Sequence, residues 1–227
     1  MPTLCYILIA FGAYLLGSIP FGFLMAKAKG IDIRSVGSGN IGATNAMRVL
    51  GKPAGIFVLL MDALKGYMAC TFLPPLIING LAPHFSGLFV YFHDEPVEFQ
   101  MRLNVVAGIF AVLGHNFTCW LNFKGGKGIA TSAGIYLALA PLAVGVALAA
   151  FILAVLLTRY VSIGSIAAAV ALAVTVWCLP RHNLFLGIVT TALAAMAIYK
   201  HQSNIKRLIA GTESRLGRKS DIQEITK

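Results

Sequence analysis

Residues 129–158, with the sequence IATSAGIYLALAPLAVGVALAAFILAVLLT, decide how many times this chain can cross a membrane. The run holds 30 residues without a charged side chain, and as a single helix it would be about 45 Å long. A helix needs only about 20 residues to cross the hydrocarbon of a bilayer, so the run is too long for one comfortable crossing and short for two. Pro141, near its middle, offers a hinge between two short spans.

The distribution of basic residues favours two spans. With two, 15 of the 18 Lys and Arg residues lie in cytoplasmic segments, whereas with one span eight lie inside and nine outside. Cytoplasmic loops carry an excess of Lys and Arg, and Lys27 and Lys29 follow the first apolar run, which places the N-terminus outside. We therefore predict an all-α integral membrane protein with seven transmembrane helices and a cytoplasmic C-terminus.

Composition agrees with a membrane protein. The 227 residues are 58% hydrophobic and 11% charged, which is more apolar surface than a soluble domain of this length can bury. We expect a single membrane-embedded domain over residues 1–217, a loop outside the membrane at 79–103, and a basic and polar tail at 218–227. The other apolar runs cover residues 4–25, 54–78, 104–123, 161–180 and 184–199.

The strongest candidate for a binding site is the segment Phe123-Lys124-Gly125-Gly126-Lys127-Gly128. Glycines let backbone N–H groups close around an oxyanion and a lysine adds positive charge, so the segment predicts a phosphate site. A helix that starts just after Lys127 would direct its first amides at the same anion, with Thr131 one turn away. A Walker A loop is excluded, because Leu121 occupies its first glycine position and Gly128 replaces its Ser or Thr. The alternative is a flexible, positively charged loop that only anchors the protein at the membrane.

A second glycine-rich segment, Gly37-Ser38-Gly39-Asn40-Ile41-Gly42, has the G-x-G-x-x-G spacing of dinucleotide-binding loops. That function requires a soluble βαβ unit, whereas Asp62, at the place of the acidic residue, lies in an apolar run and is expected to pair with Lys65 at i+3. The segment and the polar residues after it, up to Arg48, fit a phosphate-binding loop and a tight turn at the membrane surface equally well. Those polar residues are Thr44 and Asn45.

Two further polar pairs have weaker patterns. Ser162 and Ser165 lie at the start of a predicted span, where helix capping competes with a functional role. His201 and Asn204 share one face of the last helix, and that face by itself favours a solvated helix near the membrane over a site. No group of His, Cys, Asp and Glu residues has metal-ligand spacing, so we expect neither a metal nor a cofactor.

Several motifs follow one another between about residue 15 and residue 217. They are Gly17-Ser18-Ile19-Pro20-Phe21-Gly22 and the segments 36–45, 123–128, 160–162 and 201–208. In this order they resemble the bacterial acyl-phosphate:glycerol-3-phosphate acyltransferase family (PlsY type), and a series of motifs is far more specific than any one of them.

The resemblance implies an enzyme of the bacterial inner membrane with its active site at the cytoplasmic face. Such an enzyme moves a fatty acyl group from acyl phosphate to the 1-hydroxyl of sn-glycerol 3-phosphate and gives lysophosphatidate, the first acylation of phospholipid synthesis. The implied partners are these two substrates, membrane lipid and a soluble enzyme that makes acyl phosphate. Nucleic acid is not among them.

The resemblance and the loops described above together suggest the site. Lys127 and Ser38 are the expected catalytic residues, and no protein side chain is expected as general base, because the phosphate of the donor would accept the hydroxyl proton. The expected acyl-phosphate-binding residues are Ser38, Gly39, Asn40, Gly125, Gly126, Lys127, Gly128 and Thr131. The expected glycerol-3-phosphate-binding residues are Arg48, Ser165, His201 and Asn204.

This chemistry accounts for the scarcity of acidic side chains. Acyl phosphate is a mixed anhydride whose phosphate leaves readily, so the protein mainly has to neutralise two phosphates and align a hydroxyl with a carbonyl. The His-x4-Asp signature of other acyltransferases is absent, because Trp120 stands five residues after His115. His115 and Asn116 lie in a predicted span, where a polar pair usually hydrogen-bonds a neighbouring helix. The acyl chain is expected in a groove between helices that opens to lipid.

Two other functions are compatible with parts of the sequence. A transporter or channel for an organic phosphate would use the same cationic segments, but it would need charges deep in the spans, where only Asp62 and Lys65 lie. A lipid-binding scaffold without activity leaves the density of phosphate-binding residues unexplained.

Overall fold

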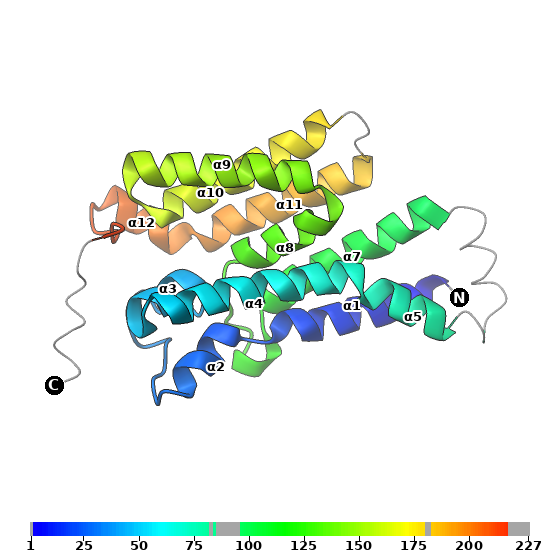
Figure 1. Ribbon diagram of the computed structural model, residues 1–227, viewed down its shortest axis with the longest axis horizontal. Coiled ribbons are helices and arrows are strands. Elements are labelled where there is room, and N and C mark those ends of the chain that lie inside the picture. Colours follow the sequence, from blue (N-terminus) through cyan, green and yellow to red (C-terminus); the bar gives the residue numbers. More distant parts are fainter. Residues whose placement is uncertain (1, 82–83, 85–95, 180–182, 218–227) are drawn as a thin grey trace. The chain divides into compact units, whose positions relative to one another are not determined.

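The computed structural model describes residues 2–81, 84, 96–179 and 183–217 (Figure 1). In these ranges the elements are helices, with no strand, which confirms the predicted all-α class. The predicted tail at 218–227 lies outside the described residues. The elements are α1 (Pro2–Ser18), α2 (Phe21–Lys27), α3 (Ala43–Leu50), α4 (Lys52–Thr71), α5 (Leu73–Leu81), α7 (Pro96–Asn116), the 3-10 turn η2 (Cys119–Leu121), α8 (Ile129–Leu139), α9 (Pro141–Thr158), α10 (Val161–Cys178), α11 (Leu184–Lys200) and α12 (Gln202–Ile209).

Helix length and surface both indicate a multi-pass membrane protein. Within the described residues, five helices are long and apolar enough to cross a membrane, and the pair α11 and α12 makes a sixth if it is counted as one span. Large apolar side chains remain on the outside of these helices, and on α9 Leu153, Leu156 and Leu157 are 59%, 72% and 76% exposed. A surface of this kind is stable in lipid and unstable in water.

The long apolar run is broken at the predicted place. α8 ends at Leu139 and α9 begins at Pro141, whose missing N–H would have no partner in the first turn of a helix in any case. The 11 residues of α8 span about 16 Å, and the 18 residues of α9 span about 27 Å. The seventh span of the prediction would therefore be a short one.

The prediction of a loop over residues 79–103 is wrong at both ends. α5 continues to Leu81 and α7 begins at Pro96, while residues 82–83 and 85–95 lie outside the described part of the chain. Glu98 lies in the first turn of α7 and pairs with Arg102 at i+4, with Oε1 and Nη2 2.5 Å apart. These polar contacts extend the helix beyond its apolar run, so hydropathy alone placed the start of α7 too late.

The chain divides into two compact units, each assembled from separate segments. Unit 1 comprises Met1–Ile19 and Asp62–Pro141, and unit 2 comprises Pro20–Met61 and Leu142–Lys227. α4 thus contributes its first half to unit 2 and its second half to unit 1.

In unit 1, α1 and α7 pack closely because glycines lie where they cross. A Cβ at Gly17 would overlap the backbone of Ala111, and a Cβ at Gly114 would overlap the carbonyl oxygen of Tyr14. Ser18 Oγ donates a hydrogen bond to Gly114 O at 3.3 Å across the same crossing. Small residues let membrane helices approach to backbone contact, which fixes the end of α7 next to the end of α1.

In unit 2, α10 packs against α11 (Figure 1). Gly164 of α10 lies against Phe151 and Val155 of α9, where an added Cβ would come within 3.0 Å of Phe151. Beyond α11 the chain bends by 51° at His201 into the short helix α12. This bend brings the end of the described chain back to the start of α10.

Candidate functional site

The segment between α7 and α8 in unit 1 folds back on the end of α7. Gly125 N donates to Asn116 O at 3.2 Å, and Gly126 N donates to His115 O at 3.0 Å. The reversal places Phe123 in the left-handed region with φ of 59°, a conformation that is rare for an aromatic residue. Main-chain hydrogen bonds therefore fix the shape of this loop, which argues against a merely flexible anchor.

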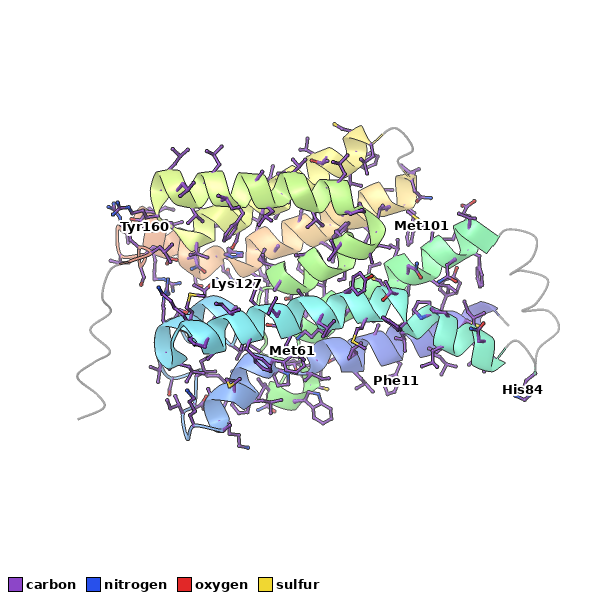
Figure 2. All side chains as sticks on the ribbon, in the orientation of Figure 1. Phe11, Met61, His84, Met101, Lys127 and Tyr160 are labelled. Atoms are coloured by element: carbon purple, nitrogen blue, oxygen red, sulfur yellow. The ribbon has the colours of Figure 1, made fainter. Side chains whose placement is uncertain are left out.

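α8 begins directly after the loop, as predicted. Gly128, with φ of 80°, precedes Ile129, the first helical residue, and no side chain caps the amides of the first turn. Thr131 is completely buried, and its hydroxyl has no hydrogen-bond partner among the described residues. Lys127 is half-buried on the loop just before the helix (Figure 2). A helix N-terminus next to a lysine favours a bound anion, so the geometry suits a phosphate.

The glycine-rich loop in unit 2 is organised by Asn45, which is 1% exposed. Its amide nitrogen donates to the backbone carbonyls of Ile33 (3.2 Å), Val36 (3.1 Å) and Asn40 (2.9 Å). Its amide oxygen accepts from the backbone N–H of Ser38 at 2.9 Å. One buried side chain thus holds four backbone groups and sets the conformation of the loop that carries Ser38 and Asn40.

A single carboxylate, Glu213, lies at the centre of the other polar cluster of unit 2. Its Oε1 accepts hydrogen bonds from Asn204 Nδ2 at 2.6 Å and from Ser162 Oγ at 3.0 Å. Its Oε2 accepts from Arg207 Nε at 2.7 Å. Ser162 therefore bonds a residue distant in sequence, and the capping role that competed for it in the sequence is not observed.

Arg48 and Ser165 lie next to this cluster. Arg48 Nη2 donates to the carbonyl oxygen of Ser214, the residue after Glu213, at 3.5 Å. Ser165 is buried on α10 near Ser162, and its Oγ donates to Val161 O at 2.9 Å. The Ser165 oxygen can therefore accept a hydrogen bond where it stands, and it can donate one to a ligand by rotating away from the helix.

His201 lies at the bend between α11 and α12, with Nδ1 2.8 Å from Ala197 O. Because a carbonyl oxygen only accepts, Nδ1 carries a proton, and Nε2 is the ring nitrogen that can change its protonation. His201 and Asn204 are 3% and 6% exposed, so the expectation of a solvated face is wrong. Asn204 is bonded to Glu213 from the chain that follows α12, a contact that a single-helix pattern cannot indicate.

The charges of this cluster are balanced locally. Burial by itself would raise the pKa of Glu213, but the hydrogen bonds from Asn204, Arg207 and Ser162 outweigh it and hold the pKa below its ordinary value of 4.5. Burial lowers the pKa of the Arg48 guanidinium, while the charge of Glu213 acts in the opposite direction. Glu213 is therefore ionised at neutral pH, and with both oxygens occupied it is a weak proton acceptor.

The chain after Glu213 is tied to the turn between α9 and α10. Arg215 Nε donates to the hydroxyl oxygen of Tyr160 at 3.0 Å, and Leu216 N donates to Arg159 O at 2.7 Å. Figure 2 shows Tyr160 at this turn, beside α12. Segment 213–216 is thus part of the polar cluster of unit 2. Among the described residues, no group of three or more His, Cys, Asp and Glu side chains could hold a metal ion, and the absence of a metal stays a prediction.

The chain is similar in sequence to known glycerol-3-phosphate acyltransferases. A family model described as "Glycerol-3-phosphate acyltransferase" matches residues 7–211. The chain therefore belongs to the glycerol-3-phosphate acyltransferase family. A relative of that name from Trichlorobacter lovleyi is 49% identical over 90% of this chain and 94% of its own, and one from Geobacter sulfurreducens is 46% identical over 89% and 93%.

Two solved structures have a similar fold. Both are crystal structures of PlsY (YgiH), an integral membrane glycerol 3-phosphate acyltransferase. The glycerol 3-phosphate form matches with a TM-score of 0.79 and 32% identity, over 98% of this chain and 99% of that chain. The lysophosphatidic acid form matches with a TM-score of 0.76 and 33% identity, over 93% and 95%.

In this member of the acyltransferase family, the predicted site residues belong to both units. Unit 1 holds Gly125, Gly126, Lys127, Gly128 and Thr131, which the structure brings together at the start of α8. Unit 2 holds Ser38, Gly39 and Asn40 on the glycine-rich loop, and Arg48 and Asn204, which bond Ser214 and Glu213. Ser165 on α10 and His201 at the bend before α12 also belong to unit 2, and their hydrogen bonds go to Val161 O and Ala197 O. The substrate assigned to each residue stays a prediction.

Sequence reasoning missed Glu213 as a site residue in this acyltransferase. The one available signal is that Glu213 is the sole acidic residue between positions 99 and 220, in a segment rich in Lys and Arg. A lone acid among bases often has a structural partner. Its actual donors, Ser162 of α10 and Asn204 of α12, are specified only by the tertiary fold.

Proposed function

We propose that this chain transfers a fatty acyl group from acyl phosphate to the 1-hydroxyl of sn-glycerol 3-phosphate and gives lysophosphatidate. The observation that carries the proposal is the nearly full-length likeness to a family enzyme solved in a glycerol 3-phosphate form and in a lysophosphatidic acid form. Those two forms supply the acceptor and the product of the proposed reaction. The two groups of polar residues described above supply phosphate-binding chemistry.

The donor phosphate is assigned to the loop before α8. Lys127 supplies a positive charge next to the uncapped start of α8, which follows Gly128. The amides of Gly125 and Gly126 already donate to Asn116 O and His115 O, so these two glycines shape the loop and are not counted as phosphate donors. In the proposed step, the 1-hydroxyl oxygen of glycerol 3-phosphate forms a bond to the acyl carbonyl carbon, and the bond from that carbon to the phosphate oxygen breaks. Lys127 and the helix N-terminus stabilise the negative charge that grows on the departing phosphate. Ser38, Gly39, Asn40 and Thr131 are assigned to acyl phosphate as well.

The acceptor is assigned to Arg48, Ser165, His201 and Asn204 of unit 2. Arg48 offers a guanidinium for the acceptor phosphate, and His201 offers Nε2. Two phosphorylated reactants carry several negative charges, so most of the required work is charge neutralisation and alignment. The proton of the attacking hydroxyl goes to the released phosphate, and no protein side chain acts as general base.

The state of Glu213 supports this substrate-assisted route. A carboxylate that served as general base would need a free oxygen and a raised pKa. Glu213 instead accepts hydrogen bonds on both oxygens, and its pKa lies below its ordinary value. Its role is to orient Asn204 and Ser162.

We extend the proposal to the membrane arrangement. The chain crosses the bacterial inner membrane seven times, with α8 as a short span, the N-terminus outside and the C-terminus in the cytoplasm. The active site faces the cytoplasm, where a soluble enzyme supplies acyl phosphate. Residues 1–217 act as one functional membrane domain, and residues 218–227 are a tail outside it. The excess of basic residues in the segments assigned to the cytoplasm supports this orientation.

The decisive experiment is a donor comparison with purified protein in detergent. Acyl phosphate, acyl-CoA and acylated acyl carrier protein are each supplied with glycerol 3-phosphate, and lysophosphatidate is measured by mass spectrometry. Of the three donors, only acyl phosphate is expected to give lysophosphatidate. Product from acyl-CoA in its place would overturn the donor assignment. Lack of product from every donor, together with uptake of an organic phosphate into vesicles, would favour a transporter, since detergent micelles have no second compartment.

A further inference from the structure

Unit 1 contains a cluster of buried ionisable side chains that the proposed reaction does not use. Asp62 and Lys65 of α4 and His115 of α7 are 2%, 3% and 5% exposed. Lys65 Nζ lies 2.8 Å from Asp62 Oδ1, as the i,i+3 spacing predicted, and His115 Nδ1 lies 3.5 Å from the same oxygen. Lys65 Nζ also donates to the carbonyl oxygen of Ile19, just after the end of α1, at 2.9 Å. The cluster thus links α1, α4 and α7 at one level of the unit.

Stability alone does not explain this arrangement. Removing two opposite charges from water is expensive, and apolar residues of the same volume usually pack at least as stably as a buried ion pair. In membrane proteins, buried ionisable residues more often belong to a functional site than to the general packing. The question is which part of the molecule the cluster serves.

His115 connects the cluster to the phosphate-binding loop, defined here as Gly125–Gly128. The backbone oxygen of His115 accepts from Gly126 N at 3.0 Å. Its ring lies directly against Gly126, because a Cβ built on that glycine would overlap ring atoms Nε2, Cε1 and Cδ2. Gly126 is itself buried, so the loop packs against the imidazole of His115 at this residue.

The orientation of that ring is in turn set by Asp62. Asp62 Oδ1 lies within ion-pair distance of both His115 Nδ1 and Lys65 Nζ, and Lys65 also bonds the carbonyl oxygen of Ile19 after the end of α1. The 3.5 Å contact at Nδ1 is electrostatic and longer than the hydrogen bonds of the unit. With Nδ1 directed at the carboxylate, the opposite edge of the ring, which carries Nε2, faces Gly126. Asn116, the next residue, extends the support: its carbonyl accepts from Gly125 N at 3.2 Å, and its side-chain oxygen would lie 3.0 Å from a Cβ on Gly128.

We propose that Asp62, Lys65 and His115 form a positioning network that holds the loop Gly125–Gly128 in its phosphate-binding shape. The assignment of acyl phosphate to this loop rests on the proposed function, whereas the support of the loop by the network does not. Asp62 and Lys65 orient the imidazole of His115. The imidazole sets the position of Gly126, and the position of Gly126 sets the direction of the backbone amides beside Lys127. These are positioning residues, since none of them is assigned a contact with substrate.

A double-mutant cycle between His115 and Gly126 tests the contact at the centre of the network. His115→Ala removes the imidazole against which the loop packs and leaves the Asp62–Lys65 pair in place. Gly126→Ala places a methyl group where it overlaps the ring of His115. Each single variant is expected to raise the KM for acyl phosphate by about 10- to 100-fold, because small misplacement of a binding group has effects of this size. The KM for glycerol 3-phosphate is expected to stay within about twofold.

The double variant separates positioning from independent damage. Once the ring is gone, the added methyl has room, so the double variant is expected to be no worse than the more impaired single variant. Losses that multiply across the two sites would overturn the proposed contact. Equal increases in the KM of both substrates would overturn positioning of the acyl-phosphate loop in particular. Glu98→Gln, which breaks an exposed ion pair on the same helix as His115, is the matched control and is expected to change neither KM.

Hydrogen exchange tests the network without relying on the reaction. In the protein without substrate, the amides of Gly125 and Gly126 are expected to exchange at least about tenfold faster in Asp62→Asn and in His115→Ala than in the unmodified protein, since their acceptors lie on the end of α7. Unchanged exchange in both variants would refute the network, even if the chain proved to be an acyltransferase. Faster exchange in a protein that makes no lysophosphatidate would uphold the network and defeat the proposed function.

Discussion

Asn45 offers the sharpest test of how the glycine-rich loop is built. Its side chain is buried and makes four hydrogen bonds to the backbone of residues 33–40, with lengths from 2.9 to 3.2 Å. A typical intramolecular hydrogen bond contributes about 0.5–1.5 kcal/mol, so the four together are worth about 2–6 kcal/mol. Water can reach parts of the loop after the substitution, which places the expected loss for Asn45→Ala in the lower half of that range, at about 2–3 kcal/mol.

Asn45→Asp is expected to be worse than Asn45→Ala, although it is nearly isosteric. The amide nitrogen that donates to Ile33, Val36 and Asn40 would become an oxygen that faces three carbonyl oxygens. Repulsion and an unsatisfied buried carboxylate are added to the loss of the same bonds. If Asn45 only filled space, Asn45→Asp would be the more stable of the two variants, since Asp fills the space and Ala leaves a void.

The assay is thermal unfolding of the purified variants in one detergent, together with kcat/KM for acyl phosphate. Both variants should lower kcat/KM. In Asn45→Ala the N–H of Ser38 loses its acceptor. In Asn45→Asp an oxygen still faces that N–H, but the loss of the three bonds from the amide nitrogen displaces the loop that carries Ser38. Thr44→Ala, on the preceding residue of α3, is the control and should stay within about 0.5 kcal/mol of the unmodified protein. An Asn45→Asp variant as stable as Asn45→Ala or more stable would refute this account of the loop.

Three further outcomes follow from the two polar groups. Lys127→Ala is expected to lower kcat by about 100-fold or more, as removal of one charge-stabilising donor usually does. Lys124→Ala, which removes the same charge from an exposed position nearby, is the control and should retain activity within about twofold. Full turnover of Lys127→Ala would defeat the assignment of Lys127 to the acyl phosphate. Glu213 has a lowered pKa, so its contribution to stability is fully present above about pH 4.5 and is lost as the pH falls through the folded-state pKa. Glu213→Gln should therefore lower the unfolding temperature at neutral pH and flatten its decline between about pH 5 and about pH 3, and an unchanged acid profile would contradict the ion-paired carboxylate. Shortening the acyl chain of the donor should raise its KM progressively, because each buried CH2 contributes about 0.8 kcal/mol, and a KM independent of chain length would exclude an apolar groove.

Several features of the structure were predictable because their causes are local in the chain. The break at Pro141, the start of α8 after Lys127 and the Asp62–Lys65 pair each depend on residues within one or two helical turns. The membrane class follows from composition, which needs no geometry at all. The start of α7 was misplaced for the same local reason, since polar contacts of Glu98 and Arg102 carry a helix past the end of its apolar run.

Local sequence patterns could not predict the burial and the hydrogen-bond partners of the candidate site residues. His201 and Asn204 have the spacing of a solvated helix face, yet both are buried, and Asn204 bonds Glu213 in the chain that follows α12. Glu213 has no motif around it, yet it receives donors from α10, from α12 and from Arg207.

From the amino-acid sequence alone come the helical membrane class, the family and the identity of the residues that suit phosphate, because hydrophobic length, charge asymmetry and motif order are properties of the chain itself. The tertiary structure alone decides which of those residues are buried, what holds them and which carboxylate joins them. The physical reason is that hydrogen bonds such as those from Gly126 N to His115 O and from Asn204 Nδ2 to Glu213 Oε1 depend on chain reversals and helix crossings, and these are set by packing of the whole unit.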